Sequence, residues 1–492
     1  MAFVNTDSEL FAIVHTKIRN KDGFDSIAIE KHGEVENYKK IKKIITLCLL
    51  TLLKLLTVTD RMFIGSALTQ IQAYYGIGNT TAGLLQSAYV FTILVVSPIT
   101  ALLANHLSTK FLILVGMFLW CVFEIVCSCI PRNMFGLYLV MRGCMGISEA
   151  TLGVLGPPII IQLFKTPRSR RYAMLFYNLS ISLGTGLGIY IATLHTILKA
   201  IPGSHGFQWA QRIPTFFAIP ILVLSTCIFE PMYFECRLYT RYIKDIKYVV
   251  QNTTFIFSTC GAIGACFCLQ AISYWYPTVI SLTDKSNPAT NPIMSNTVVL
   301  SIVMTICGAC GHLFINILAG KLKKRFESAH TYVGGLFTLT SCLFLALAQC
   351  CFNAMHWFWT FEILGLFMIN AYSAVCHEIL LRTTPPHIRP AASGVYIVLC
   401  HLFGEGISPF IVGLISDIIK SQNPNFASSY YYQRVSLSNG MSISFFVLYI
   451  AASLFLFSCL TYQKDYERRN FIMREEYLQV KLTSKTKRQK KR

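Results

Sequence analysis

Charged side chains are scarce in this sequence. They make up 13% of the 492 residues, while hydrophobic residues make up 54%, against roughly 25% charged residues in an average soluble domain. A soluble chain of this size buries only about three quarters of its unfolded surface, so it could not hide so many apolar side chains from water. The apolar residues also lie in long continuous runs. The composition therefore excludes a soluble enzyme and a disordered chain, and it indicates a polytopic membrane protein.

Paired cysteines, catalytic signatures and a signal peptide are also missing. The 18 cysteines are scattered through apolar runs, which is typical of small apolar helix residues and argues against a disulfide-stapled secreted domain. No GxSxG elbow, Walker loop or HExxH zinc motif occurs. Residues 1–43 are polar without an apolar core, so we expect the first apolar run to act as a signal anchor. We expect neither an enzyme nor a bound cofactor or metal.

Twelve apolar stretches are long enough to cross a bilayer, for which about 20 residues are needed. We expect these spans at 44–64, 82–104, 111–130, 136–164, 172–194, 212–232, 253–282, 297–320, 331–351, 357–380, 391–417 and 441–462. A basic stretch after the sixth span divides the chain six plus six, as in secondary transporters built from two pseudo-symmetric bundles. The sequence therefore predicts an all-α polytopic membrane protein with twelve transmembrane helices in two six-helix bundles.

The basic residues predict an orientation. With the N-terminus in the cytoplasm, 34 of the 43 Lys and Arg residues lie on the cytoplasmic side and 6 on the opposite side. Because cytoplasmic segments carry the excess of Lys and Arg, both termini are predicted to be cytoplasmic. This placement accounts for the net charge of +20 without a nucleic-acid partner. The predicted organisation is a tail at 1–43, a bundle at 44–232, a linker at 233–252, a bundle at 253–462 and a basic tail at 463–492.

Two further features follow from this orientation. The C-terminal KLTSKTKRQKKR is either an ordinary basic tail or a segment attracted to anionic lipid, at about 1 kcal/mol per basic residue. On the opposite side, the first loop carries the sequon Asn79-Thr80-Thr81, which this orientation offers for glycosylation.

Ionisable residues inside the spans are the candidates for function, because each costs about 2.5 kcal/mol or more unless it pairs or faces a cavity. Arg142 and Glu149 are seven residues apart, hence two helical turns apart on one face. We expect Asp60 to face Arg142, and Arg61 to face Glu149 or a substrate. A carboxylate beside a movable cation gains and loses a proton as its partner moves, which is what proton coupling requires. The alternative is a set of static ion pairs that hold the bundle in register.

Other ionisable residues in the spans carry less weight. Glu405 shares the eleventh span with His401, and it is a further candidate for substrate or proton coupling. Glu362 lies near the start of the tenth span. His377 and Glu378 lie near the cytoplasmic boundary of that span, where we expect them to be solvated.

Several stretches together resemble the Spinster family of the major facilitator superfamily. VTDRMFIGSAL in the first span and RGCMGISEA in the fourth resemble the corresponding helices of that family. The most specific match is HLFGEGISPFIVGLISD in the eleventh span. The similarity runs from about residue 44 to residue 417 and leaves both tails uncovered.

The resemblance implies alternating-access transport of lysophospholipids or sphingoid lipids such as sphingosine-1-phosphate, with proton coupling in some members. It also implies a late endosomal, lysosomal or plasma membrane. Matched by position, Asp60, Arg61, Arg142 and Glu149 correspond to the polar pocket of the N-terminal half. Two alternatives stay open: a carrier of small organic solutes, and a receptor or scaffold that kept the fold without transporting.

One motif departs from the superfamily pattern. The segment after the second span usually reads G-x-L-x-D-R-x-x-R-K and latches one conformation at the cytoplasmic face. Here Asn105 replaces the acid, His106 the first arginine and Thr109 the second, and only Lys110 remains. We expect Asn105, His106 and Lys110 to give an altered gate.

Spans 2, 5, 8 and 11 usually line the seams between the two bundles in this superfamily. Here all four are mostly apolar and contain small residues. Gly184, Gly186 and Gly188 in the fifth span are expected to permit close helix packing. The predicted substrate enters sideways, with its head group toward Arg61 and Arg142 and its tail along a seam. Bulky substitutions at Gly184 or Gly404 are therefore expected to block that route.

The predicted topology can be tested by cysteine labelling in intact cells. Cysteines introduced at 200–210 or 421–438 should react with an impermeant maleimide added from outside. Lys244→Cys should react only after the membrane is permeabilised. Labelling of Lys244→Cys from outside would contradict the orientation.

Overall fold

The computed structural model describes residues 25–489 apart from positions 105, 200, 202–204, 233–238, 287–294, 323–327, 387 and 423–428. The chain divides into two compact units, Met1–Ile45 and Thr46–Arg492. The regular elements of the described residues are helices, as expected for an all-α membrane protein.

The helices follow the apolar runs of the sequence. In chain order they are α1 (Asp25–Ser66), α2 (Leu68–Tyr75), α3 (Asn79–Leu103), α4 (Thr109–Cys127), α5 (Phe135–Cys144), α6 (Gly146–Leu163), α7 (Pro167–Thr193), α8 (His195–Leu198), α9 (Gly206–Ile228), α10 (Tyr239–Val250), α11 (Thr253–Ser286), α12 (Asn296–Leu322), α13 (Ala329–Cys350), α14 (Met355–Ile369), α15 (Ala371–Thr383), α16 (Arg389–Leu399), the π-helical η1 (Cys400–Gly406), α17 (Ser408–Gln422) and α19 (Tyr430–Gln489).

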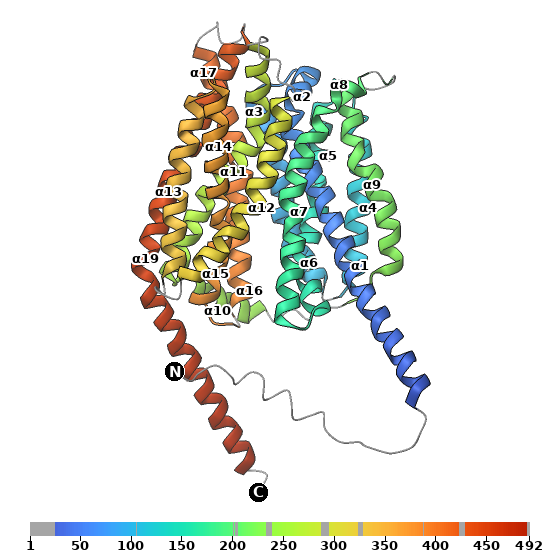
Figure 1. The fold of residues 1–492 in the computed structure, drawn as a ribbon, viewed down its shortest axis with the longest axis vertical. Coiled ribbons are helices and arrows are strands. Elements are labelled where there is room, and N and C mark those ends of the chain that lie inside the picture. The colour runs from blue at the N-terminus through green and yellow to red at the C-terminus, as the bar shows by residue number, and fades with distance from the viewer. Residues whose placement is uncertain are drawn as a thin grey trace. The chain divides into compact units, whose positions relative to one another are not determined.

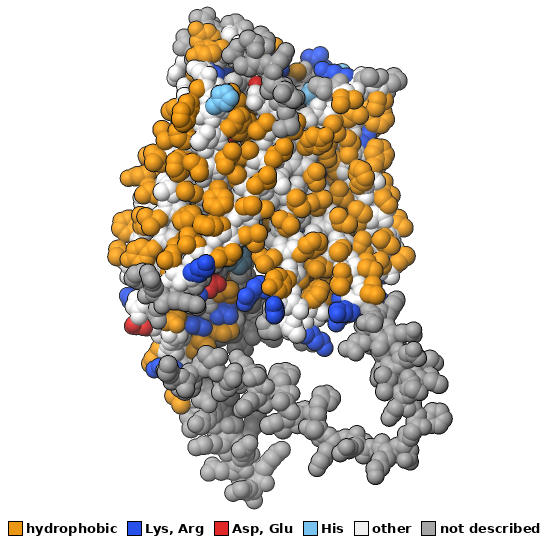
Figure 2. Space-filling model, viewed as in Figure 1, with side chains coloured by type: hydrophobic (Ala, Val, Ile, Leu, Met, Phe, Trp, Pro, Cys, Tyr) orange, Lys and Arg blue, Asp and Glu red, His pale blue; other side chains and the backbone are white. Residues whose placement is uncertain are grey.

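Ten helical segments among the described residues are long and apolar enough to cross a membrane. The other two expected spans are also helical. One is α1, whose apolar part carries three charged residues, and the other is the shorter α14, which continues after a turn at Asn370 as α15. Figure 2 shows hydrophobic side chains spread over the visible face, with Lys and Arg near the two ends of the helices and more of them at the lower end. The fold class predicted from the sequence is therefore confirmed.

Besides α1, which begins at Asp25 instead of 44, two helices begin six or more residues before the expected spans. The sixth span begins at Gly206 instead of 212, and the last helix begins at Tyr430 instead of 441. Arg212 therefore lies inside α9, where its guanidinium donates to the hydroxyl of Ser128 at 2.9 Å and to the carbonyl of Ser128 at 3.2 Å. These contacts satisfy polar groups where α4 ends.

The two bundles meet along two seams. In Figure 1, α13, α15, α17 and α19 lie on one side, and α4, α6, α7 and α9 lie on the other. Helix α7 packs against α12, and helix α3 packs against α17 and η1. These helices are spans 5, 8, 2 and 11, the four that were expected to line the seams.

The three glycines of α7 allow close contact with two different helices, α1 and α12. A Cβ at Gly184 would lie 2.9 Å from the carbonyl oxygen of Leu55 on α1, and one at Gly188 would collide with the carbonyl of Thr59. Gly186 points the other way, toward the Thr305 hydroxyl on α12. Positions four residues apart share a helix face, whereas the residue midway between them does not.

The expectation that Gly184 and Gly404 lie in the seams is therefore wrong. Gly184 faces α1 of its own bundle, and a Cβ at Gly404 would lie 2.6 Å from the Cβ of Cys266 on α11, also in its own bundle. The seam glycines are Gly186 and Gly406, the latter facing Val90 of α3. The sequence pattern marks close packing, but it does not say which neighbour is approached.

An acid of one bundle caps a helix of the other. The Asp417 carboxylate on α17 accepts from the backbone N–H of Asn79 at 3.2 Å and from that of Thr80 at 2.7 Å. The Thr80 hydroxyl adds a third bond at 2.8 Å. A carboxylate at a helix N-terminus satisfies free N–H groups and complements the helix dipole. We call this contact the α3–α17 cap.

The same contact covers the sequon. The Asn79 side chain is 5% exposed, and its amide donates to the Ser416 hydroxyl at 2.9 Å. The amide nitrogen that a glycan would occupy is therefore engaged in this conformation.

The α3–α17 cap can be tested by hydrogen–deuterium exchange of the purified protein. Asp417→Ala should speed exchange at Asn79 and Thr80 by about twofold to thirtyfold, because a lost N-cap costs about 0.5–2 kcal/mol. Asp465→Ala is a matched control, since Asp465 of α19 caps Thr254 of α11 at 2.7 Å within one bundle. It should speed exchange at Thr254 and leave Thr80 unchanged. Unchanged exchange at Thr80 in Asp417→Ala would show that the cap does not hold the bundles together.

Candidate functional site: a charge cluster between the bundles

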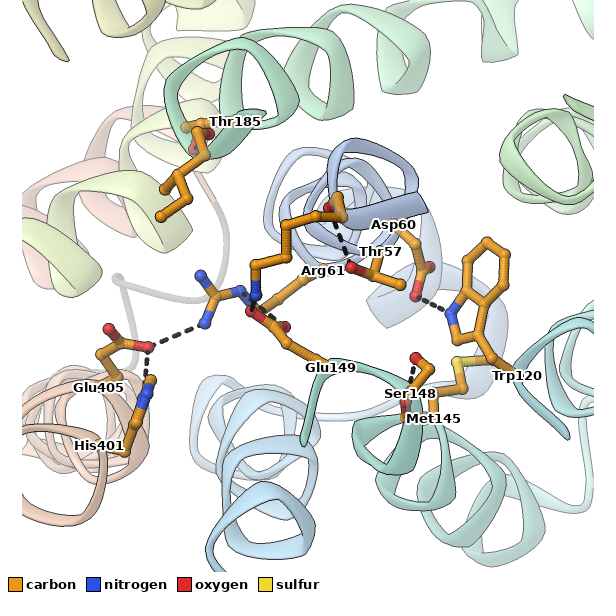
Figure 3. Close-up of polar contacts among 12 residues, drawn as sticks. Thr57, Asp60, Arg61, Trp120, Met145, Ser148, Glu149, Thr185, His401 and Glu405 are labelled. Atoms are coloured by element: carbon orange, nitrogen blue, oxygen red, sulfur yellow. Dashed lines mark hydrogen bonds and ion pairs between the residues drawn. The ribbon is translucent and has the colours of Figure 1, made fainter. Parts of the chain in front are cut away.

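Helix α1 carries three charged side chains into the protein interior. Lys54 is 8% exposed, Asp60 1% and Arg61 6%. Charges at such depth persist only when each has a partner. The partners come from α5, α6 and η1, so α1 lies at the centre of the cluster (Figure 3).

The first pair joins α1 to α5. Nη1 of Arg142 lies 2.7 Å from both carboxylate oxygens of Asp60, and Nη2 donates to the Asp60 carbonyl at 3.1 Å. The indole of Trp120 donates to the same carboxylate at 3.3 Å, and the Tyr89 ring lies 5.1 Å from the guanidinium. Arg142 is fully buried. The contact expected between Asp60 and Arg142 is present, and charge-assisted bonds of this kind are the strong ones.

The second group joins the two bundles. Glu149 accepts from Lys54 at 2.9 Å and lies 3.6 Å from Nε of Arg61. Nη1 of Arg61 reaches Glu405 of η1 at 2.8 Å, and His401 contacts the same carboxylate at 3.1 Å. Figure 3 shows Arg61 between Glu149 on one side and Glu405 on the other. Arg61 therefore bridges the seam, with one acid in each bundle.

Two interruptions in the helices position these groups. A one-residue turn at Met145, whose backbone stays in the helical region, separates α5 from α6. Arg142 and Glu149 lie within the one membrane-spanning segment Phe135–Leu163, as expected from the sequence. They reach adjacent residues of α1, Asp60 and Arg61, and not one another. The π-helical η1 holds Glu405, and π segments are frequent at functional sites.

Two charged residues of the cluster, Lys54 and Glu124, were not predicted to belong to it. Lys54 pairs with Glu149, and Glu124 of α4 lies fully buried 4.0 Å from Nη1 of Arg142. Like the predicted members of the cluster, both are charged residues inside an apolar run of the sequence. Of the two residues expected near the boundary of the tenth span, His377 is exposed, and Glu378 pairs with Arg382 at 2.8 Å near the end of α15.

The structure describes part of the segment that was expected to form an altered gate, Asn105, His106 and Lys110. His106 is exposed, and Asn105 lies outside the described residues. The ammonium of Lys110 donates to the carbonyl of Thr226 at 2.6 Å, near the C-terminal end of α9. A cation there complements the helix dipole of its own bundle. The gating role of this segment stays a prediction.

An apolar cavity lies beside the cluster, where α3 meets η1 and α17. Its volume is about 350 Å³. It shares η1 with Glu405, and Phe91 at its edge is 62% exposed. Ser87 is its one polar lining residue, and its hydroxyl donates to the carbonyl of Gly406 across the seam at 2.5 Å. The lining residues are Leu84, Ser87, Ala88, Val90, Phe91, Leu94, Leu139, Leu402, Gly406, Ile407 and Phe410.

Comparison with known proteins now assigns the family. The family model described as Major Facilitator Superfamily matches residues 50–409. This chain belongs to that superfamily. It is therefore an integral, multi-pass membrane protein of a transporter superfamily, as its helices indicate.

Within the superfamily, the chain is similar to curated proteins named spinster homologues. The chain is 27% identical to Protein spinster homolog 3 of Danio rerio over 397 residues, covering 77% of this chain and 78% of the relative. It is 28% identical to Protein spinster homolog 1 of Mus musculus over 413 residues, covering 80% and 76%. These matches confirm the resemblance to the Spinster family.

A solved structure agrees with the architecture. A bacterial homologue of the human lysosomal transporter Spinster, in an inward-facing and unoccupied conformation, superposes with a TM-score of 0.74 at 16% identity. The match covers 86% of this chain and 98% of that one. At this identity the likeness shows the fold, and it confirms the major facilitator architecture.

The Asp60–Arg142 pair can be tested by a double-mutant cycle in detergent. Asp60→Asn and Arg142→Met should each destabilise the protein by about 3–5 kcal/mol, because each leaves a buried charge without its partner. The double variant should be less destabilised than the sum of the two. The control is Arg382→Gln, whose half-exposed pair with Glu378 should cost about 1 kcal/mol or less. Additive losses of thermal stability would contradict a coupled pair.

Proposed function

We propose that this chain is a secondary active transporter of single-chain lipids, a lysophospholipid or a sphingoid phosphate, working by alternating access of its two bundles. This proposal is supported by an apolar cavity that reaches the same helical segment as the Arg61–Glu405 pair. Leu402 and Gly406 of its lining belong to η1, and so does Glu405. One helical segment therefore offers a polar end and an apolar route to a molecule that needs both.

The polar end is proposed at Arg61. Its guanidinium is shared between Glu149 and Glu405, and a phosphate presents the same kind of oxygen acceptors as these carboxylates. A head group can therefore take the place of Glu405 without leaving the arginine unpaired. Arg142 is enclosed by Asp60 and fully buried, so we place the head group at Arg61 and not between the two arginines.

The apolar route is proposed along the seam of α3 with η1 and α17. Moving an alkyl chain through water costs about 0.8 kcal/mol per CH₂ group, so a lipid carrier needs an apolar path for the tail. The cavity lining offers ten apolar or glycine residues and one hydroxyl. A carrier of sugars would need donors and acceptors along the same surface, because hydroxyl groups must keep hydrogen bonds when they leave water.

Proton coupling is proposed through the same groups. When the bundles move, Glu405 separates from Arg61, and a carboxylate that loses its cation in a buried place takes up a proton. Since the proton and the head group both act on the Arg61–Glu405 pair, their binding is linked. Glu149 keeps its pair with Lys54 during this exchange.

The proposed setting of the protein follows from the orientation and the relatives. We propose that both termini are cytoplasmic, that the bundles comprise 44–232 and 253–462, and that the basic tail contacts anionic lipid. The similar bacterial protein is itself a homologue of a human lysosomal transporter. This likeness supports a late endosomal or lysosomal membrane, with the plasma membrane as the alternative.

Reconstituted vesicles test this function. The purified protein should move a labelled lysophospholipid or sphingoid phosphate, faster with a pH gradient than without one. Arg61→Gln should reduce transport at least about tenfold, because the head group loses a charge-assisted bond worth about 1.5–3 kcal/mol. Leu402→Trp should slow long-chain lipids more than short-chain analogues by filling the cavity. Arg382→Gln is the control and should transport normally.

The competing functions give different results in the same assay. If hexoses or amino acids compete for transport and lysolipids do not, the chain is a small-solute carrier. If lipids bind but no substrate crosses the membrane, the chain is a receptor or scaffold. Either result would overturn the proposed function.

A further inference from the structure

Two buried acids share one arginine behind the candidate site. Nη1 of Arg142 lies 2.7 Å from Asp60 and 4.0 Å from Oε2 of Glu124. Arg142 and Glu124 have no exposed surface, and Asp60 is 1% exposed. One guanidinium balances one carboxylate, so this group of three carries a surplus negative charge if both acids are ionised. A charge of that kind costs several kcal/mol in a dry interior.

No second cation faces Glu124 from the helices packed around it. From α1 it is faced by Asp60, and from α5 by Arg142 and Tyr138. Its own helix contributes thiols, and α9 contributes the amide of Gln211. The thiols are Cys121 and Cys127, which like the phenol of Tyr138 are neutral when protonated.

The remaining charged residues of these helices are engaged elsewhere. Arg212 of α9 donates to Ser128. Glu149, the charged residue of α6, pairs with Lys54 and Arg61. Within the described part of the chain, Arg142 is therefore the cation that faces Glu124.

The polar atoms around Glu124 suit a neutral acid. Within the described residues, neither carboxyl oxygen makes a hydrogen bond of good geometry, and the same holds for the amide oxygen and nitrogen of Gln211, although Gln211 lies within reach of the carboxyl group. A protonated carboxyl group donates through its O–H and accepts through its carbonyl oxygen, while a Gln amide offers one acceptor and two donors. The two groups can satisfy one another through a small side-chain shift only if Glu124 is protonated, because an ionised carboxylate offers nothing to the amide oxygen.

We propose that Glu124 is a proton-binding site of this chain, neutral while Arg142 holds Asp60. A shift of the guanidinium by about 1 Å would bring it from 4.0 Å to hydrogen-bond distance of Glu124. Arg142 then leaves Asp60, the O–H bond of Glu124 breaks, and the proton forms an O–H bond on Asp60. The total charge of the three groups is unchanged. Asp60 precedes Arg61 in sequence, so the proton arrives beside the substrate pair.

The role of this proton in transport rests on the proposed function, whereas the protonation itself does not. Infrared difference spectroscopy of the purified full-length chain in H₂O and D₂O reports protonated carboxyl groups through their C=O stretch. Glu124→Gln should lose one component of this band. Glu362→Gln removes a fully buried acid of the other bundle and should leave that component in place. A band that is unchanged in Glu124→Gln would overturn the proposal.

A second variant keeps the test valid if Glu124→Gln does not fold. Gln211→Leu retains the acid and removes its amide partner, so the Glu124 component should remain and shift in frequency. A spectrum of Gln211→Leu identical to that of the parent would contradict the pairing on which the proposal depends.

Transport supplies the last arm of the experiment. The ratio of lysolipid transport with and without a pH gradient should fall at least about fivefold in Glu124→Gln, the lower end of typical coupling between sites. Glu362→Gln should keep the parent ratio. A parent ratio in Glu124→Gln would overturn the role in coupling. If the parent protein moves no lipid but Glu124→Gln still loses its band, the proposed function fails and the proton site stands.

Discussion

The constraint on which the structure depends is the cost of placing charge inside hydrocarbon. Helix α1 carries Lys54, Asp60 and Arg61 into the interior, and each needs a partner at hydrogen-bond distance. The partners come from the fourth span, on either side of the turn at Met145, and from the π-helical segment of the eleventh span. Gly184 and Gly188 serve the same end by letting α7 approach the backbone of α1.

The contacts between the bundles differ in kind along the seams. At one end, Asp417 caps α3 through backbone N–H groups. Elsewhere, Arg61 of α1 joins Glu405 of η1 by charge, and an apolar cavity lies where α3 meets η1 and α17. A cap and an ion pair are short-range, directional contacts that are either made or broken, whereas an apolar contact tolerates sliding. Such a seam suits two bundles that exchange between discrete arrangements.

The sequence predicted the fold and part of the cluster, for identifiable reasons. Spans are predictable because hydrocarbon demands long apolar runs, and the Asp60–Arg142 contact was predictable because charges in spans must pair. The helices that Gly184 and Gly404 contact were predicted wrongly. Glu124 was not predicted to have a role. Which neighbour a helix face meets depends on helix rotation and packing, and these are properties of the assembled bundles. Lys54 likewise lies inside the first expected span, but its pairing with Glu149 is visible only in three dimensions.

The central claim is that a lipid head group competes with Glu405 for Arg61. It is tested most directly by measuring the affinity of the purified protein for a single-chain phospholipid, with Glu405→Gln beside the parent. Removing the competing charge should tighten binding of the phosphate-bearing lipid by at least about fivefold. It should leave the binding of an uncharged single-chain amphiphile unchanged. Binding that is weaker or unchanged for the phosphate-bearing lipid in Glu405→Gln would contradict the account.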